Sequence, residues 1–131
     1  NEQAAKDISE LWNKFLSEDI ISKIPNKISQ DIYSVYTEYE KDHTKPYTTI
    51  LGCKVENIDL VPEGMTGKLF RGGNYTTFTA KGKITEGVVY KAWKEIWEAD
   101  IARAYTADFE VYGEKAQNPD NAEIDILVAV N

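Results

Sequence analysis

The chain contains one pattern twice: an amphipathic helix followed by two strands, and this pattern most constrains its fold. In residues 4–16, apolar side chains recur at steps of three and four, which places them on one helix face: Ala5, Ile8, Leu11, Trp12, Phe15 and Leu16. A second stripe in residues 85–99 has the same spacing and comprises Val88, Val89, Ala92, Trp93, Ile96 and Trp97. Each stripe predicts a helix with one buried face.

Strand-like runs follow both helices. Residues 32–39 (IYSVYTEY) are rich in β-branched and aromatic side chains, and residues 47–55 form the next such run. The polar segment that ends at Pro46 predicts a hairpin between them. In the second half, strands are expected at residues 108–112 and 124–130, with a turn at residues 118–121.

An additional strand is expected before the second helix. Residues 68–70 and 75–80 are predicted to be extended and joined by a tight turn at residues 71–74 (RGGN), and Gly82 ends this stretch. The second half therefore predicts the order strand, helix, strand, strand. In the first half, the counterpart of the leading strand is expected upstream of Asn1 or is missing from the chain.

The two halves also align with each other. A shift of 76 positions matches five identities over about nineteen positions without a gap: Val35 with Val111, Tyr36 with Tyr112, Glu38 with Glu114, Ile50 with Ile126, and Leu51 with Leu127. An internal duplication explains these matches and the repeated element order, and shared strand composition is the alternative. We predict a single α+β domain over residues 1–131, with βαββ repeats at about residues 1–60 and 65–131.

Charge and cysteine content narrow the classes of partner. The chain has 22 acidic and 15 basic side chains, and its formal charge of −7 repels phosphate backbones, so any nucleic-acid binding would need a fused basic module. The single cysteine, Cys53, cannot form an internal disulfide, which favours a cytoplasmic location. Cys53 and the lone His43, expected in a surface loop, cannot complete a zinc site without carboxylates. No apolar stretch is long enough to span a membrane, no cofactor is expected, and a homodimer is one assembly open to the chain.

Strand alternation assigns Glu110 to a face. Phe109 and Val111 point to one side of the strand, and Asp108, Glu110 and Tyr112 point to the other. If Phe109 and Val111 face the helices, Glu110 lies between or outside the repeats, where it is either solvated or lines a pocket. Most strand glutamates are solvated. A desolvated one would attract a cation, and aromatic walls would add ~0.5–2 kcal/mol.

Aromatic residues complete the candidate ligand site. Tryptophans on a helix stripe are more often core residues, but Trp97 lies near the end of its helix, from which its ring can cover a cleft. Tyr75 either contributes from a facing strand or packs across it. The predicted ligand-binding residues are Glu110, Tyr112, Tyr36, Trp97, Tyr75 and Trp93. No phosphate-binding glycine loop, Gly-x-Ser-x-Gly or His-Glu-x-x-His motif is present, so no catalytic residue is predicted.

Taken in order, these segments resemble the GyrI-like, or AraC-type effector-binding, family. The matching segments are collinear and cover nearly the whole chain: residues 11–15 (LWNKF), 33–39, 51–55 (LGCKV), 73–78 (GNYTTF), Gly82, 92–97 (AWKEIW), 103–105 (RAY) and 108–112 (DFEVY). The resemblance implies a pseudo-symmetric pair of βαββ units with a ligand cleft between them.

The resemblance also implies a bacterial small-molecule sensor. Family members bind amphipathic, often cationic compounds, frequently within multidrug-responsive transcription regulators, and the glutamate at the position of Glu110 lies in their pocket. Some stand alone, and some are thought to hydrolyse cyclopropane-bearing toxins with this glutamate. In the first repeat, Ser34 occupies the position of Glu110. Ligand binding is therefore the first expectation, hydrolysis with Glu110 as acid or base, assisted by Tyr36 or Tyr112, is the second, and a purely interacting acidic protein is the third.

Overall fold

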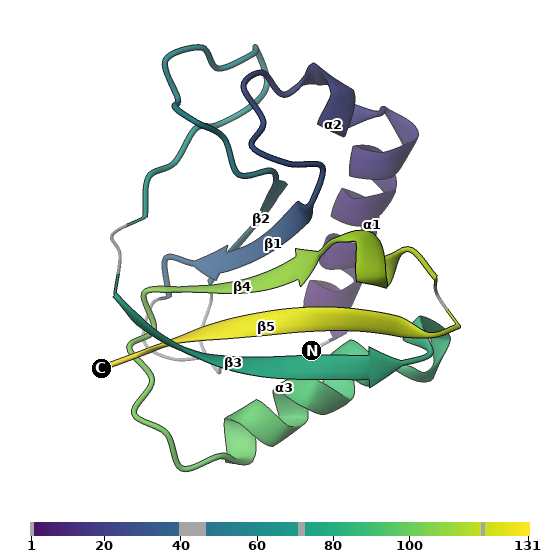
Figure 1. The fold of residues 1–131 in the computed structure, drawn as a ribbon, viewed down its shortest axis with the longest axis vertical. Coiled ribbons are helices and arrows are strands. Elements are labelled where there is room, and N and C mark those ends of the chain that lie inside the picture. The colour runs from purple at the N-terminus through teal and green to yellow at the C-terminus, as the bar shows by residue number, and fades with distance from the viewer. Residues whose placement is uncertain (1, 40–46, 71–72, 119) are drawn as a thin grey trace.

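In the computed structural model, which describes residues 2–39, 47–70, 73–118 and 120–131, five strands form one antiparallel sheet (Figure 1). The elements are α1 (Glu2–Ser17), α2 (Ile20–Lys23), β1 (Ile32–Thr37), β2 (Thr48–Gly52), β3 (Asn74–Gly82), α3 (Val88–Glu98), β4 (Ala107–Tyr112) and β5 (Ala122–Val130), with 3₁₀ turns at Ile84–Glu86 and Glu114–Ala116. Both predicted helices are confirmed, as are the strands expected at residues 32–39, 47–55, 75–80, 108–112 and 124–130. None of the helices in these ranges is long and apolar enough to cross a membrane.

The strand order β2-β1-β4-β5-β3 brings the first hairpin strands of the two halves together at the centre of the sheet. β1 and β4 pair antiparallel, and Ser34 lies directly opposite Glu110. These are the two positions that the shift of 76 residues equates. The order helix, strand, strand occurs in both halves of the chain. The internal duplication itself stays a prediction.

The registers of β2 and β5 do not fit an alignment of the two halves without a gap. On β2, Leu51 lies opposite Ser34, and on β5, Ile126 lies opposite Glu110. Leu51 therefore corresponds to Ile126 and not to Leu127, which the constant shift assigned to it. Residues that oppose each other on neighbouring strands share a face, and a slip of one residue moves a side chain to the other face. The shift of 76 residues therefore holds for β1 and β4, and a shift of 75 relates β2 to β5.

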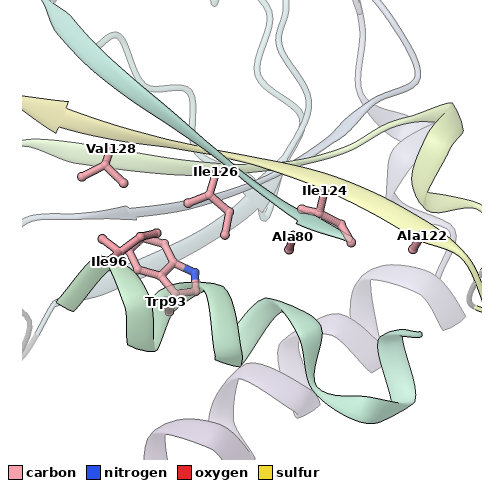
Figure 2. Packing of buried hydrophobic residues seen from close by; sticks show 7 residues of the cluster. All are labelled: Ala80, Trp93, Ile96, Ala122, Ile124, Ile126 and Val128. Carbon is pink, nitrogen blue, oxygen red and sulfur yellow. The ribbon is translucent and has the colours of Figure 1, made fainter. Parts of the chain in front are cut away.

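The helices α1 and α3 lie on the same side of the sheet (Figure 2). Trp93 and Ile96 of α3 point toward the sheet, where they join the buried cluster of Ala80, Ala122, Ile124, Ile126 and Val128. Ile96 is 1% exposed, and burial of a side chain of this size contributes roughly 1.5–3 kcal/mol. From α1, the ring of Trp12 contacts that of Tyr112 edge-on, with centroids 4.9 Å apart. The buried cluster packs α3 on β3 and β5, and the contact of Trp12 with Tyr112 places α1 beside β4.

The sequence prediction considered an arrangement in which Phe109 and Val111 face the helices, but the helices cover the other face of β4. They cover the face of Glu110, whereas Phe109 and Val111 point to the opposite side of the sheet. Phe109 packs there against three aromatic rings at centroid distances of 5.6 to 6.4 Å: Tyr33, Phe70 and Tyr75. Alternation separates the two faces of a strand but does not say which one the helices cover.

One predicted strand does not form. Residues 68–70 pair with no strand in the described ranges. The prediction that they form a hairpin with residues 75–80 is therefore wrong. β3 pairs with β5 along its whole length instead, from Asn74 opposite Val130 to Gly82 opposite Ala122. The polar turn with His43, residues 71–72 of the predicted tight turn, and Pro119 lie outside the described residues.

Gly82 ends β3 in a conformation that other residues disfavour. Its φ is +136°, and an added Cβ would meet Cγ1 of Val88 at 3.0 Å. We expect Gly82→Ala to lower the free energy of unfolding by about 1–3 kcal/mol. Gly73→Ala is the matched control, with an expected change within ~0.5 kcal/mol, because an added Cβ there meets nothing within 4 Å. Urea unfolding followed by tryptophan fluorescence measures both, and equal stabilities would contradict the argument.

Candidate functional site

A cavity of about 270 Å³ is lined by residues of both helices and both central strands. Its lining residues are Ile8, Trp12, Tyr36, Tyr39, Tyr47, Val89, Tyr90, Trp93, Trp97, Arg103, Glu110 and Tyr112. Eight of the twelve are aromatic, and only Arg103 and Glu110 carry charged groups. The cavity thus combines ring walls with one potential anion and one cation.

Five of the six predicted ligand-binding residues line this cavity: Glu110, Tyr112, Tyr36, Trp97 and Trp93. Tyr75 does not, because it lies on the other face of the sheet, where its ring is 5.7 Å from that of Phe109. The register explains this difference. Tyr75 pairs with Ala129, two residues from the Leu127 that opposes Phe109, so all of them share the face away from the helices.

The carboxylate of Glu110 accepts three hydrogen bonds from neutral side chains. Tyr36 Oη and Trp93 Nε1 donate to Oε2 at 2.8 and 2.6 Å, and Tyr112 Oη donates to Oε1 at 2.5 Å. Glu110 is only 2% exposed. Within the described part of the chain, no Lys, Arg or His forms an ion pair with it. Donors from β1, α3 and β4 therefore hold a buried carboxylate that has no fixed counterion.

Burial raises the pKa of Glu110 above the usual 4.5, and the hydrogen bonds from Tyr112, Trp93 and Tyr36 oppose this rise. Burial and the adjacent Glu110 also raise the pKa values of Tyr36 and Tyr112, so both hydroxyls stay protonated and can donate. Ionising a buried carboxylate that has only neutral partners is costly, and a cation in the cavity would offset that cost. The site is therefore suited to a positively charged ligand.

Asp108, two residues before Glu110 on the same face of β4, has its partners within the protein. It is fully buried, and Arg103 Nη2 donates to its Oδ2 at 2.9 Å. The hydroxyl of Tyr39 donates to the same oxygen. Its Oδ1 accepts the backbone N–H of Ala129 at 2.9 Å. The two neighbouring carboxylates thus differ in kind, because only Asp108 has a fixed counterion.

Five of the polar or aromatic cavity residues were not among the predicted ligand-binding residues: Trp12, Tyr39, Tyr47, Tyr90 and Arg103. Trp12 was assigned to the core from its helix stripe, and its ring does contact Tyr112. Arg103 belongs to the RAY segment of the family resemblance, which was a usable signal. Nothing local in the sequence pointed to Tyr39 or Tyr47, because their places depend on how the β1–β2 hairpin meets β4.

A larger cavity of about 700 Å³ lies beside β2 and the segment that follows it, and its lining includes Tyr75 and Phe109. Its walls are mainly apolar, and they hold no buried carboxylate comparable with Glu110 among the residues that the structure describes. In the same residues, no group of three or more His, Cys, Asp or Glu side chains could hold a metal ion. The smaller cavity is therefore the candidate functional site.

Comparisons with known proteins give one matching family and two similar proteins. The family model described as Cass2, integron-associated effector binding protein, matches residues 1–130. A Bacillus subtilis (strain 168) protein named "Putative transcriptional regulator protein YobU" is 31% identical over 127 residues, covering 94% of this chain and 79% of that protein. The crystal structure of an integron cassette protein from the mobile metagenome of Vibrio cholerae matches with a TM-score of 0.64 and 30% identity, over 95% of this chain and 76% of that one.

Proposed function

The chain belongs to the family of integron-associated effector binding proteins, and we propose on this basis that it binds a small aromatic cation in the cavity around Glu110. An effector-binding family and a relative named as a transcriptional regulator support a small-molecule binding role. The observation that carries the choice of a cation is the buried Glu110 carboxylate, which has three neutral donors and no ion-pair partner among the described residues.

The aromatic walls support an aromatic ligand. The rings of Tyr36 and Trp93 meet edge to face with centroids 5.6 Å apart, and Trp12 and Tyr112 form a similar pair at 4.9 Å. A cation against such ring faces gains ~0.5–2 kcal/mol beyond its attraction to the carboxylate. The volume of about 270 Å³ lies just below the usual range for ligand pockets, which favours a compact ring system of two or three rings.

We further propose that binding serves as a sensor of such compounds, either in a stand-alone protein or as the sensing part of a transcription regulator. The formal charge of −7 leaves any nucleic-acid contact to a separate basic module or partner. The chain's single cysteine is consistent with a reducing compartment such as the cytoplasm.

N-methylquinolinium, a compact permanent cation, tests the proposal. We expect Glu110→Gln to weaken its binding about 10- to 100-fold, because the loss of one carboxylate charge at short range costs roughly 1.4–2.8 kcal/mol. The variant should fold, since a glutamine oxygen at the Oε2 position can still accept the bonds from Tyr36 and Trp93. Quenching of tryptophan fluorescence by the ligand measures the affinity.

Glu95→Gln is the matched control for net charge, since Glu95 is an exposed acid on α3, and its affinity should equal that of the wild type. Unchanged affinity in Glu110→Gln, or an equal loss in both variants, would refute charge pairing at Glu110.

A second candidate function is hydrolysis of a reactive, cyclopropane-bearing toxin. The raised pKa of Glu110, with tyrosine hydroxyls 2.5 and 2.8 Å from its oxygens, favours it, because a carboxyl group whose pKa is raised is better suited to exchange a proton with a substrate. Time-dependent conversion of such a compound, lost in Glu110→Gln, would support the enzyme. Binding without conversion would support the sensor.

A further inference from the structure

Arg103 has donor groups that no described residue uses. It lines the same cavity as Glu110, and its side chain is 4% exposed. Nη2 donates to Asp108, but Nε and Nη1 have no hydrogen-bond partner in the described ranges. A guanidinium carries five N–H donors, and buried donors are almost always paired, so two unpaired buried nitrogens on a residue that lines a cavity call for an acceptor.

The surrounding structure fixes the position of this guanidinium. Its central carbon lies 4.4 Å from the ring centroid of Tyr105 and 5.9 Å from that of Trp93. Tyr105 adopts a φ of +55°, an uncommon conformation for a residue other than glycine, and such conformations cluster at functional sites. The same segment is bonded to the end of β5 through the N–H of Ala104 and the carbonyl of Ala129, at 2.9 Å. Arg103 is therefore held in place before any ligand arrives.

We propose that Arg103 forms a second subsite, so that the ligand is a dipolar molecule with its cationic part at Glu110 and a carbonyl or carboxylate oxygen at Nε and Nη1 of Arg103. This inference rests on the function proposed above and narrows the class of ligand. Trp93 lies between the subsites, because its Nε1 donates to Glu110 while its ring contacts the guanidinium.

The ion pair with Asp108 determines which acceptors fit. Asp108 already offsets the positive charge of Arg103, so the unpaired donors belong to a pair with no net charge. A neutral carbonyl can therefore satisfy them as well as a carboxylate can. The shared requirement is an acceptor oxygen, which a cation that carries only hydrocarbon groups lacks.

Three N-methylquinolinium ligands that differ only at ring position four test this inference. That position carries a methyl group, a carboxamide or a carboxylate. We expect the wild type to bind the carboxamide about tenfold more tightly than the methyl compound, because hydrogen bonds to a charged donor are the strong ones. Tighter binding of the carboxylate as well would extend the ligand class to zwitterions. Isothermal titration calorimetry measures all three affinities.

The double variant Arg103→Met/Asp108→Asn removes the guanidinium without leaving a buried carboxylate unpaired. We expect its ratio of carboxamide to methyl affinity to fall to about one, as the loss of the hydrogen bonds requires. Lys115→Met/Glu123→Gln is the matched control, since it removes an ion pair outside the cavity and should keep the wild-type ratio. Circular dichroism confirms that each variant is folded.

The possible failures are distinct. Equal affinities of the wild type for the methyl compound and the carboxamide would overturn the role of Arg103 and leave cation binding at Glu110 intact. Failure of the wild type to bind any of the three cations would instead overturn the proposed function. A carboxamide preference that persists in Arg103→Met/Asp108→Asn would assign the acceptor to another donor and also overturn the inference.

Discussion

Asp108→Ala should lower the free energy of unfolding by about 3–5 kcal/mol, because it leaves the guanidinium of Arg103 buried without its counterion. The same change removes the acceptor of the Ala129 backbone N–H and of the Tyr39 hydroxyl. Domains of this size have unfolding free energies of roughly 5–15 kcal/mol, so the variant should lose a large part of its stability. Urea unfolding followed by tryptophan fluorescence, with the soluble yield, measures the effect.

A double-mutant cycle isolates the ion pair. Adding Arg103→Met to Asp108→Ala should restore part of the lost stability, because the unpaired buried charge is gone, and the coupling energy should exceed ~2 kcal/mol. Asp125→Asn, an exposed strand residue, is the control and should change stability by less than ~0.5 kcal/mol. A loss under about 1 kcal/mol in Asp108→Ala would show that the ion pair does not stabilise the fold.

Binding of the permanent cation N-methylquinolinium should weaken as pH falls, by up to about tenfold per pH unit once Glu110 is protonated. The ligand favours the ionised carboxylate, so its binding releases a proton wherever free Glu110 holds one. Since burial raises the pKa of Glu110, this weakening should begin at a higher pH than for an ordinary carboxylate of pKa 4.5. Fluorescence titrations between pH 8 and pH 5 measure the slope.

The tyrosines near Glu110 do not contribute to this pH dependence of ligand affinity. Burial raises the pKa values of Tyr36, Tyr47 and Tyr112, so these groups stay neutral throughout the range. Glu110→Gln should bind weakly and show no such slope. Affinity of the wild type that does not change with pH would mean that Glu110 does not pair with the cation.

The raised pKa of Glu110 also makes the stability of the fold depend on pH, in the opposite direction to ligand binding. Folded protein holds the Glu110 proton to higher pH than the unfolded chain does, so the stability that protonated Glu110 contributes is fully present below about pH 4.5 and is lost as pH rises through the raised pKa. Ligand-free wild type should therefore lose stability relative to Glu110→Gln over that rise. Thermal unfolding of both proteins at several pH values checks this.

Periodicity was sufficient to predict most of the fold. The stripes that contain Trp12 and Trp93 became α1 and α3, because a helix with one apolar face must bury it. It failed at residues 68–70, where a short apolar run lies in an irregular segment and places Phe70 against Phe109. A run of three residues carries too little periodicity to separate a strand from a loop that packs on a sheet.

The candidate site was predictable in part. Local patterns made Glu110 and Trp93 candidates, and the family resemblance gave Glu110 most of its weight. Neither could orient β4, so the sequence left open whether the helices would cover the face of Glu110 or the face of Phe109. Tyr75 was assigned to the cavity because its strand was expected to face Glu110, whereas its register with Ala129 points it away. The partnership of Arg103 with Asp108 and the unpaired nitrogens of Arg103 are properties of three-dimensional packing, which no spacing rule records.

The direct pairing of Ser34 with Glu110 across β1 and β4 limits the negative charge that the cavity can hold at this position. Residues paired across neighbouring antiparallel strands have Cβ atoms about 4.5–5.5 Å apart, so an acid at both positions would place two buried carboxylates side by side. Such pairs share one proton instead of ionising twice. The paired positions 34 and 110 can therefore hold only one full negative charge between them. For the cation binding proposed above, we therefore expect a stoichiometry of one monocation per chain.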